Sequence, residues 1–192
     1  VQIGAVVTPN AAAGLGYVNG NIGQLNLVNR NNLSASSMVF VNKDASLQLN
    51  NAFGLGSATL VLNGGALSLN TPISNPVSMI SDSVSFNNGS TTNSVLRGPV
   101  NLSPSGVGGT RTINVGGNIG LTIQGVMSGA PGTNLIKGGA NDLYLMGLNT
   151  YQGTTTVTST GNIYMGTSVL PNVAGAFGIS DTPVSFGAAG AI

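Results

Sequence analysis

A run of residues in the second half of the chain repeats a strict pattern at every second position. The stretch 135–157 reads LIKGGANDLYLMGLNTYQGTTTV, and its odd positions look selected whereas its even positions vary freely. Successive residues of a β-strand point to opposite faces, so a period of two indicates extended chain with one side inward. The selected positions are Leu135, Lys137, Gly139, Leu143, Leu145, Gly147, Asn149, Tyr151, Gly153, Thr155 and Val157.

The same period recurs along the chain as triplets with apolar ends and a usually polar middle. Turn signals such as Asn63-Gly64-Gly65 and Gly116-Gly117 separate the triplets. The sequence therefore predicts many very short strands, each of which buries two side chains. Representative triplets are Leu25–Leu27, Leu47–Leu49, Leu67–Leu69, Val84–Phe86, Ile113–Val115, Leu143–Leu145 and Ile163–Met165.

The composition favours strands and excludes several classes of function. Only 5% of the residues are charged, against about 25% in an average soluble domain. The 24 Asn, 20 Ser, 17 Thr and 30 Gly residues are mediocre or poor helix formers. A net charge of +1 gives no electrostatic basis for binding nucleic acid or an anionic membrane. Without Cys, disulfides and thiolate chemistry are excluded.

Short, evenly spaced strands fit either an antiparallel sandwich or a β-solenoid. We favour the solenoid, because the strands are shorter than average and the outward Asn, Ser, Thr and Gln residues can form ladders when coils stack in register. At roughly 20–25 residues per coil, we expect about eight coils in a single all-β domain over residues 1–192. Residues 1–21 are a candidate N-terminal arm or cap, and residues 87–94 a candidate protruding loop.

The selected positions of the first stretch resemble the autotransporter-associated β-strand repeat of secreted bacterial passenger domains. That pattern, written as alternate residues, runs Leu, Lys, Gly, Gly, Leu, Leu, Gly, Asn, Tyr, Gly, Thr, Val. This chain departs from it at Asn141, which replaces the second Gly and which also tolerates the left-handed conformation. The resemblance extends over roughly residues 50–192 and is weak over the first fifty.

The resemblance implies a right-handed parallel β-helix that is exported and displayed at, or released from, the bacterial cell surface. In that frame Leu143, Leu145 and Val157 would fill the core, and Gly147 and Gly153 would permit tight corners. Asn149 would bond backbone groups at a bend. The resemblance implies no catalytic activity, and any connection to the outer membrane would run through segments outside this sequence.

Residues capable of chemistry are few. The four carboxylates, Asp44, Asp82, Asp142 and Asp181, are more than thirty residues apart in sequence, and we interpret Asp142 and Asp181 as turn residues. Calcium and transition-metal sites lack their usual ligand patterns. Neither Lys43 nor Lys137 lies in a recognisable Ser–Lys setting. We expect no enzyme activity and no cofactor, and we interpret Arg97 and Arg111 as solvated charges.

The tyrosines offer one candidate binding surface. Tyr144 and Tyr164 occupy the outward, middle positions of their triplets and are about one coil apart. We expect them to stack on neighbouring coils, either as ordinary packing or as an exposed aromatic ladder that binds glycan or another filament. Two interpretations of Tyr151 are possible: it is a core residue with its hydroxyl at the rim, or it is a stacking residue on the next coil.

These observations lead to three hypotheses. The first is a structural β-helix of a cell-surface or extracellular protein, serving as a stalk, fibre or adhesin body. Its partners would be further copies of itself stacked end to end, or the remainder of a longer chain, with surface glycans as additional ligands. The second is a glycan-binding or glycan-cleaving β-helix. The third is an antiparallel β-sandwich filament subunit with Val1–Val7 as a donated strand.

Overall fold

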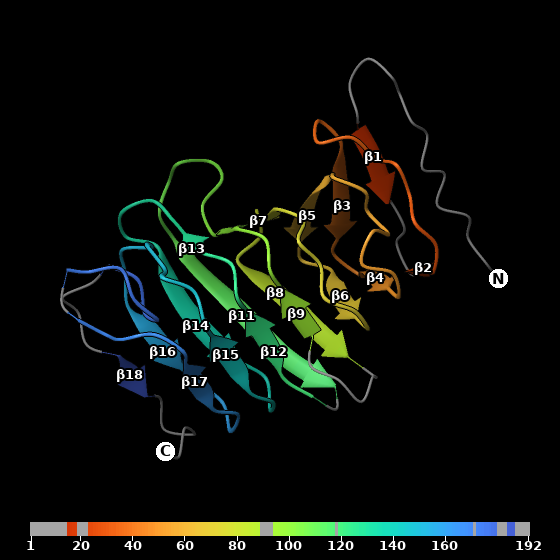
Figure 1. Cartoon of the computed structure of the whole chain (residues 1–192). Helices are drawn as coiled ribbons and strands as arrows, with labels where there is room; N and C mark the ends of the chain where they lie inside the picture. The colour runs from red at the N-terminus through yellow and green to blue at the C-terminus, as the bar shows by residue number, and fades with distance from the viewer. Residues whose placement is uncertain are drawn as a thin grey trace.

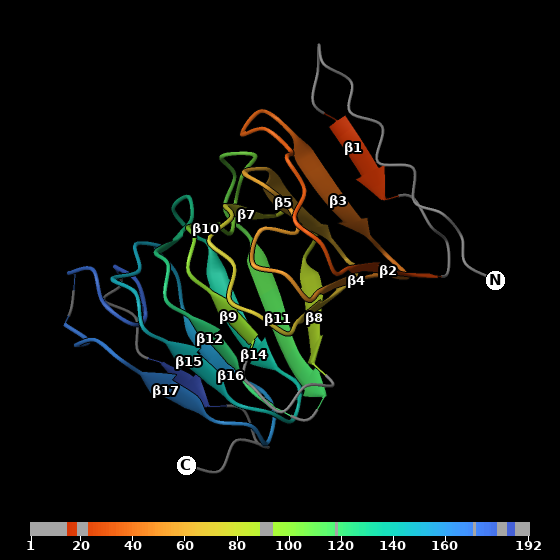
Figure 2. The ribbon, with the colours of Figure 1, turned by 45° about the vertical axis from the view of Figure 1, so that its right-hand side comes forward.

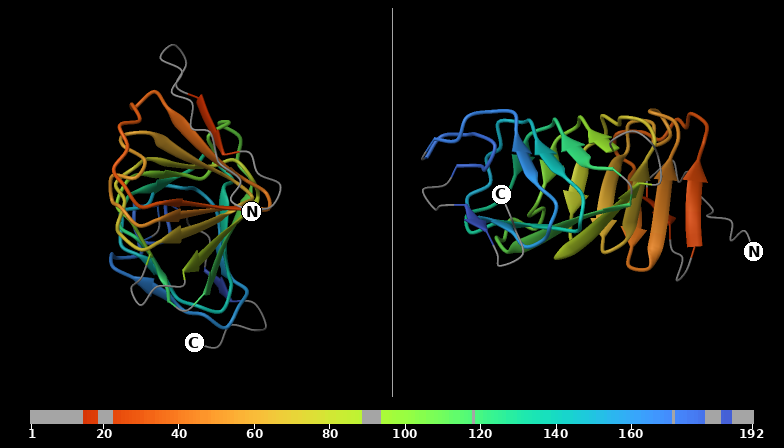
Figure 3. Two further views of the ribbon diagram at one scale, coloured as in Figure 1. Left: turned by 90° about the vertical axis from the view of Figure 1, so that its right-hand side faces the viewer. Right: turned by 90° about the horizontal axis from the view of Figure 1, so that it is seen from below.

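The strands of this chain stack on one another along a single axis. The computed structural model describes residues 15–18, 23–88, 94–117, 119–170, 172–179 and 184–186. The described residues form eighteen short β-strands and no helix. Figure 1 shows the strands following one another from β1 (Leu15–Val18) to β18 (Ser185–Phe186), and the right-hand view of Figure 3 shows the same stack lengthwise.

The strands form three sheets in which neighbours are parallel. Sheet A contains β1, β3 (Met38–Asn42), β5 (Thr59–Asn63), β7 (Val77–Met79), β10 (Val100–Asn101) and β13 (Met127–Ser128). Sheet B contains β2 (Gly23–Leu27), β4 (Ala45–Leu49), β6 (Ala66–Leu69), β8 (Ser83–Asn88), β11 (Thr110–Gly117), β14 (Asn134–Gly138), β16 (Thr155–Val157) and β18. Sheet C, visible in Figure 2, contains β9 (Ser94–Leu96), β12 (Leu121–Ile123), β15 (Leu143–Leu145) and β17 (Ile163–Met165).

This topology confirms the predicted fold class, an all-β parallel β-helix. Each described strand pairs with a strand one coil away rather than with its neighbour in sequence, which rules out the antiparallel sandwich. Val1–Val7, the strand that the sandwich would donate, lies outside the described residues. The helix has about six turns instead of the expected eight. Coil length varies widely, because Leu60 pairs with Val77, 17 residues on, whereas Ser83 pairs with Thr112, 29 residues on.

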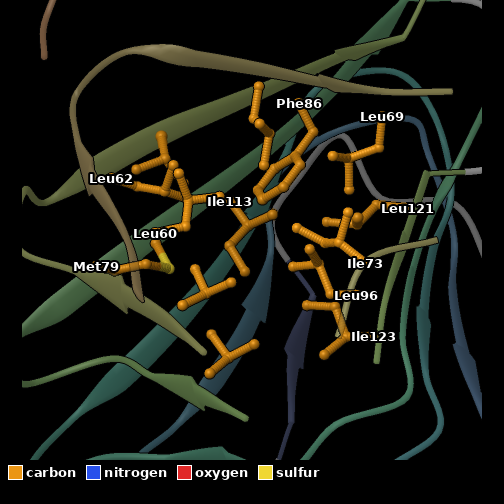
Figure 4. Packing of buried hydrophobic residues seen from close by; sticks show 14 of the residues in the cluster. Leu60, Leu62, Leu69, Ile73, Met79, Phe86, Leu96, Ile113, Leu121 and Ile123 are labelled. Atoms are coloured by element: carbon orange, nitrogen blue, oxygen red, sulfur yellow. The ribbon is translucent and has the colours of Figure 1, made fainter. Parts of the chain in front are cut away.

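The core lies between the three sheets and is filled by the inward residues of each triplet. In β4 the burial alternates strictly along Ala45–Leu49, and Leu47 and Leu49 are fully buried. Figure 4 shows leucine, isoleucine, methionine and phenylalanine side chains from successive coils meeting in this interior. Each fully buried side chain of this kind contributes roughly 1.5–3 kcal/mol, so the coils are held together chiefly by apolar contact with their neighbours.

Polar side chains on the outward positions form ladders across coils, as the sequence predicts. Asn50 Nδ2 donates to Asn26 Oδ1 at 2.5 Å, and Asn70 Nδ2 donates in turn to Asn50 Oδ1. A second ladder joins Gln24 Nε2 to Gln48 Oε1 at 2.7 Å. These bonds satisfy amide groups between equivalent positions of stacked coils, and they explain how a chain with so few charges presents a polar surface.

The two segments expected to leave the helix body fall partly outside the described residues. Within 1–21, residues 15–18 form β1, which pairs in register with β3. Within 87–94, Asn87 and Asn88 end β8 and pair with Gly116 and Gly117 of β11. Ser94 begins β9, and residues 89–93 lie outside the described part of the chain.

Candidate functional site

The strict inward positions of the motif are buried. Leu135, Leu143 and Leu145 are fully buried, and Val157 is almost so. They belong to β14, β15 and β16, which bring residues of three strands to one short section of the interior. These residues hold the section together and offer no reactive group, so their part is structural.

Asn149 bonds backbone groups of two other coils. It is fully buried, its Oδ1 accepts from the Met127 N–H at 2.8 Å, and its Nδ2 donates to the Ala176 carbonyl at 2.8 Å. Its own N–H donates to the Gly175 carbonyl at 2.9 Å. The side chain therefore joins three successive coils at one bend, and it bonds backbone groups there as the motif resemblance implies.

Tyr151 is a core residue. Its side chain is fully buried and its hydroxyl lies 2.6 Å from Thr155 Oγ1, which is buried as well. The hydroxyl is therefore bonded inside the helix and not at the rim, and the ring is not a surface stacking residue. Burial strongly raises the pKa of the Tyr151 phenol, and the hydrogen bond to Thr155 opposes that rise.

The motif glycines act mainly by allowing close approach of the backbone. A Cβ on Gly147 would lie 2.5 Å from the Gly125 carbonyl oxygen, and one on Gly153 would lie 2.2 Å from the Thr133 carbonyl oxygen. Gly139 differs, because its φ of 75° lies in the left-handed region. Asn141 does not adopt that conformation; its Nδ2 donates to the Gly117 carbonyl at 2.6 Å instead.

Lys137 lies in the core with its ammonium beside a serine. Its side chain is fully buried, and Nζ donates to the Gly139 carbonyl at 2.6 Å and to Ser159 Oγ at 3.1 Å. Burial lowers the pKa of the ammonium from its ordinary 10.5, and the Asp142 carboxylate opposes that fall. No pattern in the sequence indicated this Ser–Lys contact, since the two residues meet only through coil stacking. These two bonds link the Gly139 corner to Ser159 on the next coil.

Arg111 corrects the expectation of a solvated charge. It is buried, and its Nη1 lies 2.9 Å from Asp82 Oδ1 in an ion pair whose carboxylate faces solvent. Arg111 shares the inward parity of Ile113 and Val115 on β11, a signal in the sequence that pointed to burial. Arg97 is exposed and follows β9 on another sheet, so the two arginines do not share a face.

Tyr144 and Tyr164 form the aromatic stack that their spacing predicts. Their ring centroids are 4.6 Å apart with planes 10° from parallel, and Tyr164 is 45% exposed. Asp142 lies at the base of this stack and its Oδ1 accepts from the Asn162 N–H at 2.9 Å. Partial burial, followed by the negative charge of Asp142, raises the pKa of Tyr144.

The described aspartates lie in separate settings. Asp82 pairs with Arg111, Asp142 bonds Asn162, and Asp44 occupies a turn with a φ of 66°. Asp181 lies outside the described residues. Within those residues no three His, Cys, Asp or Glu side chains gather as a metal-binding group.

A groove on the flank of the first coils was not predicted from the sequence. Its volume is about 650 Å³, and Arg30–Leu33, Phe53, Ser57, Ser74–Pro76 and Arg97 contribute to its lining. We call it the lateral groove. Phe53 is 57% exposed, and the Arg30 guanidinium carbon lies 5.0 Å from the centroid of its ring. No local sequence signal marks this groove, because its residues come from four coils.

Comparisons of this chain with known protein families, curated proteins and solved structures found no match. The part of the chain that the structure describes contains no helix that could span a membrane. The resemblance to the autotransporter-associated repeat is therefore carried by the motif residues alone.

Proposed function

We propose that this chain is a structural β-helix segment of a bacterial cell-surface or extracellular protein, serving as a stalk, fibre or adhesin body. It is a scaffold without catalytic activity of its own. The observation that carries the proposal is the in-register stacking of parallel strands over the whole described chain. A shaft requires this property, because continuous backbone hydrogen bonds then join each coil to the next along the axis.

The polar ladders support this role. Amide side chains bond their counterparts one coil away, as in Asn50 with Asn26 and Asn63 with Asn42. Such bonds do not depend on ionic strength in the way that surface ion pairs do. A surface built from amides and hydroxyls therefore suits a protein exposed to variable salt outside the cell, and the motif resemblance points to the same location.

Shape is the direct test of the shaft proposal. Small-angle X-ray scattering of the purified chain should give the profile of an elongated particle whose cross-section matches one β-helix. Antibodies raised against the chain should label intact cells of its source organism if the protein is displayed. A compact globular profile would overturn the shaft, and labelling confined to permeabilised cells would overturn surface display.

Stacking of further coils is part of the proposal. In β17, the last described strand of sheet C, Tyr164 is 45% exposed and Met165 53% exposed. Another coil, from the remainder of a longer chain or from a second copy, would cover these side chains and extend the sheet. For stacking between copies we expect the sedimentation coefficient to rise with concentration in the micromolar range. A monomer at all such concentrations would exclude it.

A second candidate function, glycan binding, is favoured by the lateral groove. An exposed aromatic ring, amide side chains and two arginines lie together in a hollow of about 650 Å³, within the roughly 300–1,000 Å³ of ligand sites. The glycan-cleaving version has no support of this kind, because cleavage requires two carboxyl groups about 5–10 Å apart, whereas Asp82 pairs with Arg111 and Asp142 bonds Asn162.

A further inference from the structure

We propose that the lateral groove binds an acidic oligosaccharide, with Arg30 and Arg97 holding its carboxylate or sulfate groups and Phe53 contacting a sugar ring. This inference rests on the glycan-binding candidate and assigns it a ligand class. It does not depend on the shaft proposal, because the chain can form an elongated shaft whether or not the groove binds a ligand.

The groove lies where one coil is shorter on this flank than those before it. The chain passes from β6 to β7 through residues 70–76, whereas the equivalent connections of the two preceding coils span residues 28–37 and 50–58. The longer connections contribute Arg30 and Phe53 to the lining. The short one contributes Ser74 and Pro76, and Arg97 comes from the next coil.

Hydrogen bonds fix this order of four consecutive coils. The Asn31 N–H donates to the Phe53 carbonyl at 3.1 Å, and Asn75 Nδ2 donates to the Gly56 carbonyl at 3.1 Å. The Arg97 N–H then donates to the Ile73 carbonyl at 2.8 Å. Three strand spacings of about 4.8 Å place the first and last coils roughly 14 Å apart. That span exceeds a single sugar ring, so the groove suits an oligosaccharide.

The charged side chains that line the groove are all positive. Arg30 and Arg97 are two of the five cationic residues of the chain, and no carboxylate lines the groove. Neither guanidinium is paired with a carboxylate within the described residues. Stacking of Arg30 on Phe53 orients its planar fork and leaves the N–H groups free for a bidentate bond to an anionic oxygen pair.

The groove favours a saccharide over an acidic peptide. Peptides commonly bind β-structures by adding a strand to an exposed edge, but residues 70–76 at this groove are already bonded to the coils on both sides. The Ile73 N–H donates to the Val95 carbonyl at 3.1 Å, and Asn75 Nδ2 also bonds the Ala58 carbonyl at 2.8 Å. Side-chain amides, hydroxyls and an aromatic ring remain at the surface, and these are the groups that bind sugar hydroxyls and ring faces.

Isothermal titration calorimetry with defined probes tests the proposal. The anionic probes are trigalacturonic acid, which carries carboxylates, and a heparin-derived hexasaccharide, which carries sulfates; maltotriose is the neutral probe. We expect at least one anionic probe to bind at one site per chain, and maltotriose to bind at least tenfold more weakly. Arg30→Gln and Arg97→Gln should each weaken that binding about tenfold, or about 1.4 kcal/mol, since each removes a charge-assisted hydrogen bond to the anionic group.

Matched controls separate this site from general charge attraction. Lys43→Gln removes one exposed cation outside the groove and should change affinity less than twofold. Equal binding of maltotriose would overturn the acidic class while leaving glycan binding in place, and binding of no saccharide would overturn both. Equal affinity for a short poly-glutamate peptide would overturn the saccharide class. Equal losses in Lys43→Gln and Arg97→Gln would overturn the assignment to the groove.

Discussion

The phenol rings of Tyr144 and Tyr164 lie face to face on the outside of the β-helix, with centroids 4.6 Å apart. They are register partners on β15 and β17, so the stacking follows from strand pairing and not from a special local conformation. On the preceding coil the equivalent position is Thr122, which pairs with Tyr144. The aromatic ladder is therefore two rungs long within the described residues.

A double-mutant cycle should detect this stack as a coupling energy. Tyr144→Ser and Tyr164→Ser should each lower the free energy of unfolding, and the coupling between them should be about 0.5–1.5 kcal/mol, as for other aromatic pairs. Urea unfolding followed by circular dichroism measures it. The cycle Thr122→Ser with Tyr164→Ser is the control, since these two residues are not register partners. A coupling no larger than in the control would contradict the stack.

The same double variant separates the two candidate glycan surfaces. The stack lies on coils beyond those that line the lateral groove, so Tyr144→Ser combined with Tyr164→Ser should leave trigalacturonic acid and heparin hexasaccharide binding unchanged within twofold. Loss of saccharide binding in this variant, with binding retained in Arg97→Gln, would move the glycan site to the tyrosine ladder.

Asn149 should be among the residues most sensitive to substitution. Asn149→Ala leaves the Met127 N–H and the Ala176 carbonyl buried without partners, at about 1–3 kcal/mol for each group. We expect a loss of about 3 kcal/mol in the free energy of unfolding, and at least as much for Asn149→Asp, which places a carboxylate oxygen against the Ala176 carbonyl. Asn162→Ala, at an exposed position, should cost less than about 1 kcal/mol. Equal losses for the two alanine variants would contradict the capping role.

Lys137 should make the stability of the fold depend on pH. Burial lowers the pKa of its ammonium below the ordinary 10.5, so the unfolded chain binds more protons between the folded-state pKa and 10.5, and stability rises with pH in that window. Tyr151 acts oppositely at higher pH, because its folded-state pKa is raised above the ordinary 10.0. The difference between wild type and Lys137→Met isolates the lysine, since both proteins keep Tyr151.

The measurement is the urea midpoint at several pH values from 7 upward. The wild-type midpoint should rise with pH relative to that of Lys137→Met. Lys43→Met, which removes an exposed lysine, should follow the wild type. Parallel profiles for wild type and Lys137→Met would show that the ammonium is not perturbed by burial.

Alternation in the sequence was sufficient to predict the fold class and much of the core. The triplet Leu143–Leu145 buries both ends and points Tyr144 outward, as a period of two requires. The same parity also places Lys137 and Arg111 inward, although their charge argues for solvent. In both cases strand geometry prevails over side-chain polarity. The Lys137 ammonium donates to the Gly139 carbonyl and Arg111 Nη1 donates to the Asp82 carboxylate, whereas the buried Arg111 Nε has no partner.

The number of coils and the lateral groove could not be predicted, for one physical reason. Both depend on how many residues the chain uses at each corner, and alternation specifies strands but not corners. Arg30, Phe53 and Arg97 are spread over nearly seventy residues and meet only once coils of unequal length stack. A groove of this kind becomes visible only when the register between coils is known.

The corner that follows β9, β12 and β15 is built from stacked glycines and yields a sharp prediction. A Cβ on Gly125 would lie 1.9 Å from the Gly98 carbonyl oxygen, and one on Gly147 would lie 2.5 Å from the Gly125 carbonyl oxygen. Neither contact is tolerable, and the obstructing atoms are backbone atoms that cannot move without shifting a coil. Gly125→Ala should therefore lower the free energy of unfolding by more than about 2 kcal/mol, since overpacking of rigid sites costs about 1–3 kcal/mol or more.

Gly132→Ala is the matched comparison for Gly125→Ala. Gly132 has a φ of 77° and open space around its Cβ position, so its substitution carries only the strain of the left-handed backbone, about 1–2 kcal/mol. Urea unfolding should therefore order the proteins as wild type, Gly132→Ala and Gly125→Ala, from most to least stable. Hydrogen exchange should show lost protection in Gly125→Ala on both coils that meet at this corner, at the Gln124 and Met146 amides. A Gly125→Ala variant as stable as Gly132→Ala would mean that the coils are not in van der Waals contact at this corner.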